Sequence, residues 1–419
     1  MLDVKKNKLI WAQVLFMAGL APFFIFPSLD RTWILLVVGG WFVFKWKVSG
    51  RFLKRTVVDW AMFVLLLQIF ISTLGAEDCV LSVPKVTGVL YGILVFYALV
   101  EFLNSKKRIK MGLVVFLVGG ILLSLVGILG MESLEKKTNS AKLDFVLSLN
   151  EKIPKINFSL PRAEEGISPN AVGGTLVLVI PLFFALMIYY RRHKREEKSW
   201  ALFFWSSLVF FLLEIFILFL TASRGSWMAL TVALAFMVWI YFLIPKKKAV
   251  WIGPLLGGVA VLLVLGYMAL IRTENIGAAA DELEGKYKGR QQAWSVGMRV
   301  AKENPLTGLG MNNVRMEEGI GYDRAHVHNQ MLNIAAELGI PGLMAFLAVL
   351  SGVGFMVWRV WWQSRDSWMR AVVLGLAGGQ LAHFIWGMGD TITLGGKPGI
   401  VFWVSVGLIA GVYDLSFRA

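Results

Sequence analysis

The feature that most constrains the fold is a series of apolar blocks, each of roughly 17 to 25 residues, separated by charged or Gly- and Pro-rich breaks. A helix of that length crosses about 30 Å of hydrocarbon. Every backbone polar group inside lipid needs an internal partner, so such blocks favour α-helices over open strands. With 57% hydrophobic and only 16% charged residues, the chain is predicted to be an all-α polytopic membrane protein.

We expect about twelve transmembrane helices and a short helical loop region on the outer side of the membrane. The chain then divides into 1–168 (five spans and an outer loop), 169–271 (four spans), a large outer loop at 272–328, and 329–419 (three spans). The expected spans are 9–26, 32–44, 57–74, 84–103, 111–130, 169–190, 200–220, 226–244, 249–271, 329–356, 369–387 and 398–415.

Charge predicts the orientation of these spans. Cytoplasmic loops carry an excess of Lys and Arg, so we expect both termini in the cytoplasm and the long breaks 131–168 and 272–328 outside. A basic cytoplasmic surface that faces anionic membrane lipids then accounts for the net charge of +15. The charge therefore gives no reason to expect a nucleic-acid partner. Lys and Arg concentrate in alternate breaks, at 45–55, 106–110, 191–198, 246–248 and 359–370.

The Cys and His content bears on metal chemistry. Cys79 is the only cysteine, so neither an intramolecular disulfide nor a multi-thiolate metal site can form. Two of the four histidines, His326 and His328, are separated by one residue, but the outer loops offer no convincing third ligand at metal spacing. We therefore expect no metal and no cofactor. An imidazole at the membrane surface is better suited to proton transfer near neutral pH.

Two arginines stand out at the expected outer ends of spans. Arg224, within a Ser-Arg-Gly sequence, lies between two apolar blocks. It either snorkels to the headgroups as an anchor or binds an anionic group through its planar guanidinium. Arg290 leads through Trp294 to the sequence Asn-Pro-Leu-Thr-Gly-Leu-Gly at 304–310. Taken alone, Arg290 is an ordinary solvated charge, and Trp294 is more often a membrane-belt anchor than a sugar-stacking ring.

Two further candidates are weaker. Asp390 follows the expected span 369–387, which also contains Gln380 and His383. These polar groups either orient a site or pair with one another. Asn329 directly follows His328 and precedes the next span.

The order and spacing of these motifs resemble the O-antigen ligase family. The resemblance is carried by the Ser-Arg-Gly sequence, by Arg-x-x-x-Trp with Asn-Pro-Leu-Thr-Gly-x-Gly, and by the spacing of His328-Asn329, Gly339 and Gly342. It implies a membrane glycosyltransferase of GT-C-like architecture in the bacterial inner membrane. Such an enzyme moves a glycan from undecaprenyl diphosphate to a lipid A-core acceptor on the periplasmic face.

The resemblance also implies roles for individual residues. His328 would be the catalytic base, Arg224 and Arg290 would bind the diphosphate, and 272–328 would be a periplasmic catalytic loop. No Asp-x-Asp pair occurs in the outer loops, so we expect a metal-independent reaction. One base and no obvious carboxylate nucleophile predict direct displacement with inversion at the sugar. The supporting candidates are His326, Asn329, Asp390 and Trp294.

Three alternatives stay open. An O-antigen polymerase would pass the glycan to a second lipid-linked unit, and a protein O-oligosaccharyltransferase would pass it to a protein. A polytopic transporter or flippase is the alternative from a different class. That class commonly contains internal repeats and midplane polar sites, and we find no convincing repeat in this chain.

Overall fold

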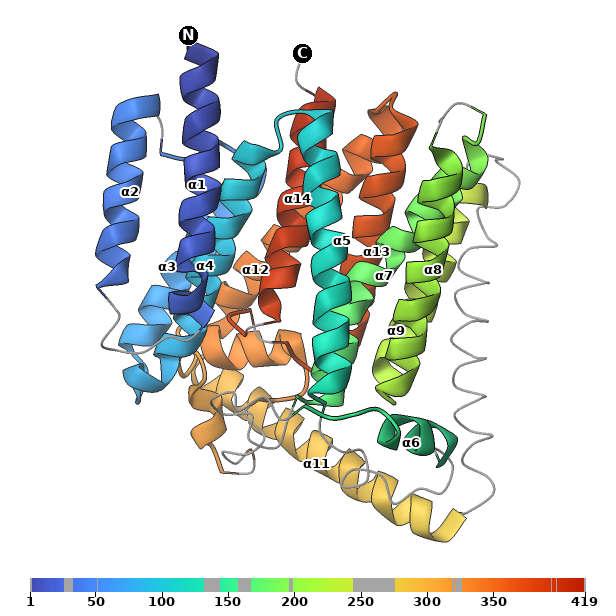
Figure 1. The fold of residues 1–419 in the computed structure, drawn as a ribbon. Helices are drawn as coiled ribbons and strands as arrows, with labels where there is room; N and C mark the ends of the chain where they lie inside the picture. The colour runs from blue at the N-terminus through green and yellow to red at the C-terminus, as the bar shows by residue number, and fades with distance from the viewer. Residues whose placement is uncertain are drawn as a thin grey trace. The chain divides into compact units, whose positions relative to one another are not determined.

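The computed structural model describes residues 2–25, 33–50, 52–131, 144–156, 167–195, 199–243, 276–318, 320, 326–392, 394–396 and 398–417. Regular structure within these residues is helical, apart from one isolated bridge between Met131 and Ile167, and this confirms the all-α prediction. The elements in Figure 1 are α1 (Leu2–Ile25), α2 (Ile34–Ser49), α3 (Asp59–Leu74), α4 (Cys79–Phe102), α5 (Lys106–Leu129), α6 (Asp144–Glu151), α7 (Pro169–Arg192), α8 (Trp200–Leu220), α9 (Arg224–Val238), η4 (Trp239–Leu243), α11 (Ile276–Glu303), η6 (Asn313–Met316), α12 (Gln330–Gln363), α13 (Ser367–Gly387) and α14 (Gly399–Phe417).

Seven of the described helices are long and apolar enough to cross a membrane, so the chain is a multi-pass membrane protein. The total of twelve spans stays a prediction. The expected span 249–271 lies outside the described residues, while α2 and α13 are helices at the expected positions 32–44 and 369–387. The seven are Cys79–Phe102, Lys106–Leu129, Pro169–Arg192, Trp200–Leu220, Arg224–Tyr241, Gln330–Gln363 and Gly399–Phe417.

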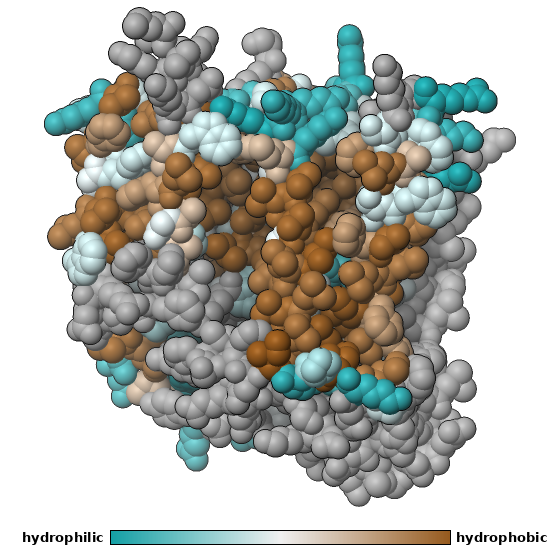
Figure 2. Space-filling model, viewed as in Figure 1, coloured by the Kyte–Doolittle hydropathy of each residue, from teal (hydrophilic) through white to brown (hydrophobic). Residues whose placement is uncertain are grey.

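The chain forms two compact units. Unit 1 contains residues 1–115, 293–369 and 392–419, and unit 2 contains residues 116–292 and 370–391. On the face drawn in Figure 2, hydrophobic side chains gather in a broad area and hydrophilic ones gather along its upper margin. Such a distribution is expected of a surface in contact with lipid.

Unit 1 is built around α4, which packs against α1, α3 and α14, while α12 packs against α3 and α14. Close approach of α4 and α14 depends on Gly92, where an added Cβ would lie 2.2 Å from the Trp403 indole. A buried ion pair joins Lys45 to Glu101 at 2.7 Å. The first residues of α1 and the last residues of α14 lie at the same end of this unit (Figure 1).

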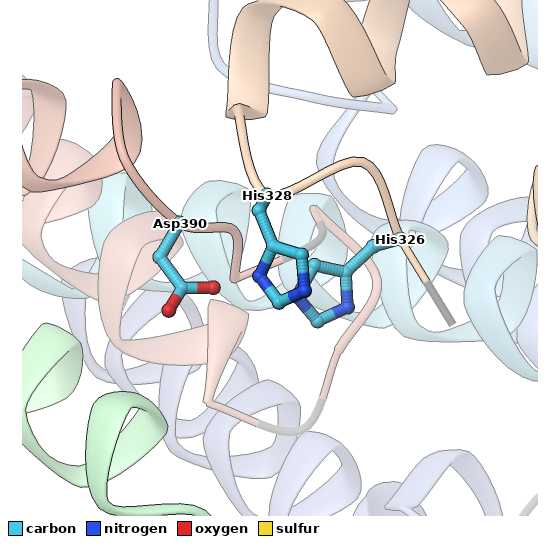
Figure 3. Close-up of side chains that lie close together, drawn as sticks. All are labelled: His326, His328 and Asp390. Atoms are coloured by element: carbon cyan, nitrogen blue, oxygen red, sulfur yellow. The ribbon is translucent and has the colours of Figure 1, made fainter. Parts of the chain in front are cut away.

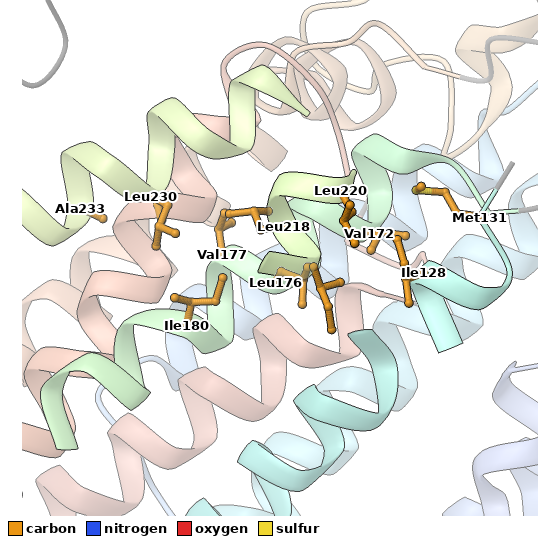
Figure 4. Packing of buried hydrophobic residues seen from close by; sticks show 12 residues of the cluster. Ile128, Met131, Val172, Leu176, Val177, Ile180, Leu218, Leu220, Leu230 and Ala233 are labelled. Carbon is orange, nitrogen blue, oxygen red and sulfur yellow. The ribbon is translucent and has the colours of Figure 1, made fainter. Parts of the chain in front are cut away.

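Unit 2 is built around α7, which is buried along most of its length and packs against α8 and α9. α7 also approaches α13, because Gly379 leaves room for the Leu178 carbonyl, which would lie 2.3 Å from an added Cβ. Figure 4 shows the hydrophobic cluster of this unit, in which α7 residues such as Leu176 and Ile180 pack against Leu218 of α8 and Leu230 of α9.

One carboxyl group lies deep inside unit 2. Glu214 of α8 is fully buried, and its Oε1 accepts a hydrogen bond from Ser124 Oγ of α5 at 3.0 Å. A charge inside the membrane is costly without a partner. The partner of Glu214 is neutral, so this contact is a polar link between two spans and not an ion pair.

Candidate active site

A kink in α12 positions the loop that precedes it. Gly339 has φ +68° and ψ −179°, which no residue in a continuous helix adopts. The left-handed φ favours glycine, and an added Cβ would lie 2.7 Å from the Leu306 carbonyl carbon. Pro341 follows and has no N–H to donate to the Glu337 carbonyl. The kink therefore leaves carbonyl groups of the preceding turn without helical partners.

The 304–310 loop supplies the missing donors. Leu309 N donates to the Ala336 carbonyl at 3.0 Å, and Gly310 N donates to the Glu337 carbonyl at 3.0 Å. In return, Ile340 N donates to the carbonyl of Pro305 at 2.7 Å. The Asn-Pro-Leu-Thr-Gly-Leu-Gly sequence at 304–310 and the kink at Gly339 therefore pack against each other.

A buried ion pair supports this arrangement from α4. Lys85 Nζ lies 2.6 Å from Glu337 Oε1, and both side chains are almost completely buried. The same oxygen accepts a hydrogen bond from Asn312 N at 2.9 Å. Sequence reasoning missed this pair, because the two residues are 252 positions apart and each lies in an apolar block. The only signal was the presence of a charged residue inside each block, which in membrane proteins marks a paired or functional group.

His328 stands where the loop enters α12. Asn329 is the N-cap of this helix, and its Oδ1 accepts a hydrogen bond from Leu332 N at 3.0 Å. His328 itself has φ +55°, a left-handed conformation that is uncommon for a residue with a Cβ. On the other side, Trp294 Nε1 of α11 donates to the His328 carbonyl at 3.3 Å. Two neighbours therefore hold a strained backbone, which is typical of functional sites.

The two histidines lie together. Figure 3 shows the rings of His326 and His328 beside each other, and their centroids are 4.5 Å apart. Both side chains are half-buried, while Val327 between them is fully buried and its N–H donates to Asn333 Oδ1. Imidazole groups are the most frequent general acids and bases in enzymes, so His326 and His328 are candidates for proton transfer.

In unit 2, Arg224 is the first residue of α9 and is half-buried. The flanking hydroxyl groups of Ser223 and Ser226 lie 2.9 Å apart, in hydrogen-bond contact. They pack on Gly173 of α7, where a Cβ would lie 2.5 Å from Ser226 Oγ. Ser-Arg-Gly-Ser is therefore a tight helix start pressed against the first turns of α7, with the guanidinium at the end of the span.

Asp390 follows α13 in the same unit. Its Oδ2 accepts a hydrogen bond from Asn170 Nδ2 of α7 at 2.7 Å, and its Oδ1 accepts one from Thr391 N at 2.8 Å. The first turn of α7 thus contacts both the Asp390 segment and, through Gly173, the start of α9.

Arg290 lies in α11 and is exposed. This helix places Arg290 and Trp294 one turn apart on one face. Within the part of the chain that the structure describes, neither Arg224 nor Arg290 forms an ion pair with an acidic side chain.

The candidates fall into two groups. Unit 1 brings together Trp294, His326, His328 and Asn329, and unit 2 contains Arg224, Arg290 and Asp390. The helices and these polar helix ends define a multi-pass membrane protein with candidate chemistry at the ends of its spans. Residues 207–347 match the family model described as O-antigen ligase, which is the family that the motifs resemble. The comparison with curated proteins gave no match.

Proposed function

We propose that the protein is a glycan ligase that moves a glycan from undecaprenyl diphosphate to a lipid A-core acceptor on the periplasmic face of the inner membrane. The observation that carries this proposal is the setting of His328. The residue has a left-handed backbone, it lies between the Trp294 hydrogen bond and the Asn329 cap, and it belongs to the matched segment 207–347. Strain of this kind persists where the surroundings hold a reactive group in place.

The chemistry needs a base and a group that stabilises the leaving diphosphate. In the proposed reaction, an acceptor hydroxyl oxygen attacks the anomeric carbon and forms the new glycosidic bond. Its proton passes to the His328 imidazole, a transfer that typically contributes about 10² to 10⁴-fold in rate. The bond from the anomeric carbon to the diphosphate breaks, the bonding electrons leave with the diphosphate, and the sugar is inverted.

Arg224 and Arg290 would bind the departing diphosphate. A guanidinium group donates two parallel hydrogen bonds to phosphate oxygens and stays charged at all physiological pH values. Support comes from the finding that neither arginine pairs with a described acidic side chain, so neither charge is already neutralised by one. A reaction stabilised in this way requires no divalent cation, and we propose that transfer is metal-independent.

The direct test is transfer by purified protein in vesicles that contain lipid-linked glycan, with and without lipid A-core. Ligation predicts that donor is consumed only when the core is present. Product in which one lipid-linked glycan has been extended by another would instead indicate a polymerase. Donor that crosses the membrane unchanged would indicate a flippase. Activity should persist in EDTA and should not rise when Mg²⁺ or Mn²⁺ is added back.

The residue roles are tested with matched variants. His328→Ala, Arg224→Ala and Arg290→Ala should lose transfer by two or more orders of magnitude. The control is His193→Ala, because His193 stacks on Tyr189 at the far end of α7 and takes no part in the proposed reaction. If His328→Ala inserts normally and retains full transfer, the proposed base is wrong.

A further inference from the structure

The 304–310 loop exposes a large apolar side chain in an unusual place. Leu306 is 72% exposed, although the backbone around it is bonded to buried parts of unit 1. Gln68 Nε2 of α3 donates to the Leu306 carbonyl at 2.6 Å and to the Leu338 carbonyl at 2.8 Å. The neighbouring residue Ile340 of α12 is also exposed. The exposed side chain of Leu306 therefore extends the exposed surface of α3 and α12.

That surface is apolar along both helices. On α3 the exposed side chains recur every three or four residues and are all hydrophobic, which marks one helix face. On α12 the exposed apolar residues follow the same spacing after the kink. The α3 face consists of Trp60, Phe63, Val64, Leu67, Phe70, Ile71 and Leu74, and the α12 face includes Ile340, Met344, Phe355, Trp358 and Trp362. In a membrane-spanning unit such faces contact lipid.

The position of Gln68 along α3 gives the depth of the loop. α3 runs from Asp59, next to the basic break at 45–55, to Leu74. The excess of Lys and Arg in that break predicts that Leu74 lies toward the outer side of the membrane. Leu74 follows Gln68 by six residues, or about 9 Å of helix. Ser72, one turn beyond Gln68, bonds the Glu337 carbonyl at the kink. The Leu306 carbonyl is therefore hydrogen-bonded at a greater membrane depth than the last exposed apolar residues of the α3 face.

Irregular backbone is tolerated at such depth only where protein groups satisfy its hydrogen bonds. In the 304–310 loop, the carbonyls of Pro305 and Leu306 accept hydrogen bonds from α12 and α3, and the N–H groups of Leu309 and Gly310 donate to carbonyls of α12. Gly308 N donates to the Asn304 carbonyl at 2.9 Å within the loop.

We propose that the 304–310 loop is inserted into the outer leaflet, with the Leu306 side chain in contact with the acyl chains of bilayer lipids. The loop would then anchor the outer end of α12, and with it the segment that contains His328, at a constant height in the membrane. This inference requires that unit 1 spans the membrane with the basic break at 45–55 on the cytoplasmic side, and it does not depend on the proposed glycan transfer.

Spin labels test the depth of Leu306. In a Cys79→Ser background, Leu306→Cys, Met344→Cys and Glu303→Cys are each labelled and placed in phosphatidylcholine–phosphatidylglycerol vesicles. Collision with oxygen is then compared with collision with a water-soluble nickel chelate. Met344 of the α12 face is the lipid reference, and exposed Glu303, next to the loop, is the aqueous reference. The oxygen-to-nickel ratio at position 306 should equal that at 344 and exceed that at 303.

A ratio at position 306 equal to that at position 303 would overturn the proposal. Because the label or the substitution could disturb the loop, a second measurement uses the unmodified chain. Wild-type protein is irradiated in vesicles of phosphatidylcholine that contains a photoreactive group in the acyl chain, and adducts are mapped by mass spectrometry. Adducts within 304–310 support insertion. Adducts on the α3 face without any in the loop would contradict it.

Discussion

Lys85 of α4 and Glu337 of α12 form a buried ion pair, with Nζ 2.6 Å from Oε1, at the point where α12 is kinked. Asn312 N donates to the same carboxylate, and Ser72 Oγ donates to the backbone carbonyl of Glu337. Glu337 thus links the kinked part of α12 to α3, to α4 and to the residue that precedes η6. The pair contributes to the position of the 304–310 loop as well as to helix packing.

Removing one partner of this pair should strongly destabilise the protein. Glu337→Ala leaves the Lys85 ammonium buried without a counter-charge, which costs about 3–5 kcal/mol. Thermal unfolding in detergent should show a large fall in Tm. The matched control is Lys106→Ala, which removes the more exposed ion pair with Asp366 and should have a small effect. The double variant Lys85→Met/Glu337→Met should recover part of the loss, and equal Tm values for Glu337→Ala and Lys106→Ala would contradict this account.

The contribution of Asn329 as the N-cap of α12 should be separable from any other role of its side-chain amide. Asn329→Ala removes the oxygen that accepts from Leu332 N and should cost about 1 kcal/mol. Transfer should fall as well, because the cap adjoins His328. Asn329→Asp keeps a good N-cap and should retain wild-type Tm. A Tm for Asn329→Asp as low as that for Asn329→Ala would show that the amide has another role.

The hydrogen bond from Trp294 should increase the rate of transfer by positioning His328. Trp294→Phe retains an aromatic ring but removes the Nε1 donor to the His328 carbonyl, a bond worth about 1 kcal/mol. We expect kcat to fall by up to about tenfold with little change in KM or in membrane insertion. If Trp294→Phe matches wild type and only Trp294→Ala loses activity, the indole acts by packing alone.

The kink should tolerate no side chain at Gly339. Gly339→Ala would bring a Cβ within 2.7 Å of the Leu306 carbonyl carbon at a positive φ, so Tm should fall and the 304–310 loop should become open to proteolysis. Gly354→Ala is the control on the same helix, since a Cβ there meets nothing within 4 Å. It should be neutral or slightly stabilising. Equal sensitivity at the two positions would argue against a special role for the kink.

The loop between α12 and α13 should give a pH-dependent contribution to stability. Burial alone would raise the pKa of Asp366, but hydrogen bonds from Lys106 and from the backbone of Met369 and Trp368 outweigh it and lower the pKa. The stabilisation is therefore fully present above the ordinary Asp pKa of about 4, and it is lost as pH falls through the lowered value.

Comparing wild type with Asp366→Asn tests this sign. The wild-type protein should have the higher Tm at neutral pH, and the difference should shrink in acid as the carboxylate takes up its proton. A Tm difference that grows below pH ~4 would mean that the direction of the pKa shift is wrong.

The sequence determined the class of the protein. Apolar blocks long enough to cross a bilayer leave the backbone no alternative to the helix, so composition and block length sufficed to predict an all-α membrane protein. The motif order likewise predicted the family whose model matches residues 207–347. These properties depend on local sequence and need no knowledge of which helices touch.

Tertiary structure decided what the motif residues do. Gly308 and Gly339 belong to separate motifs, yet each serves the contact between the loop and the kink, where a Cβ on Gly308 would lie 2.4 Å from the Glu337 carbonyl carbon. The Lys85–Glu337 pair joins positions 252 residues apart, and its partners could not be assigned from sequence. Helix propensity and hydropathy describe one segment at a time, whereas ion pairs and close glycine contacts depend on which segments the fold brings together. The physical reason is that lipid sets each span's length and polarity, but only packing selects its neighbours.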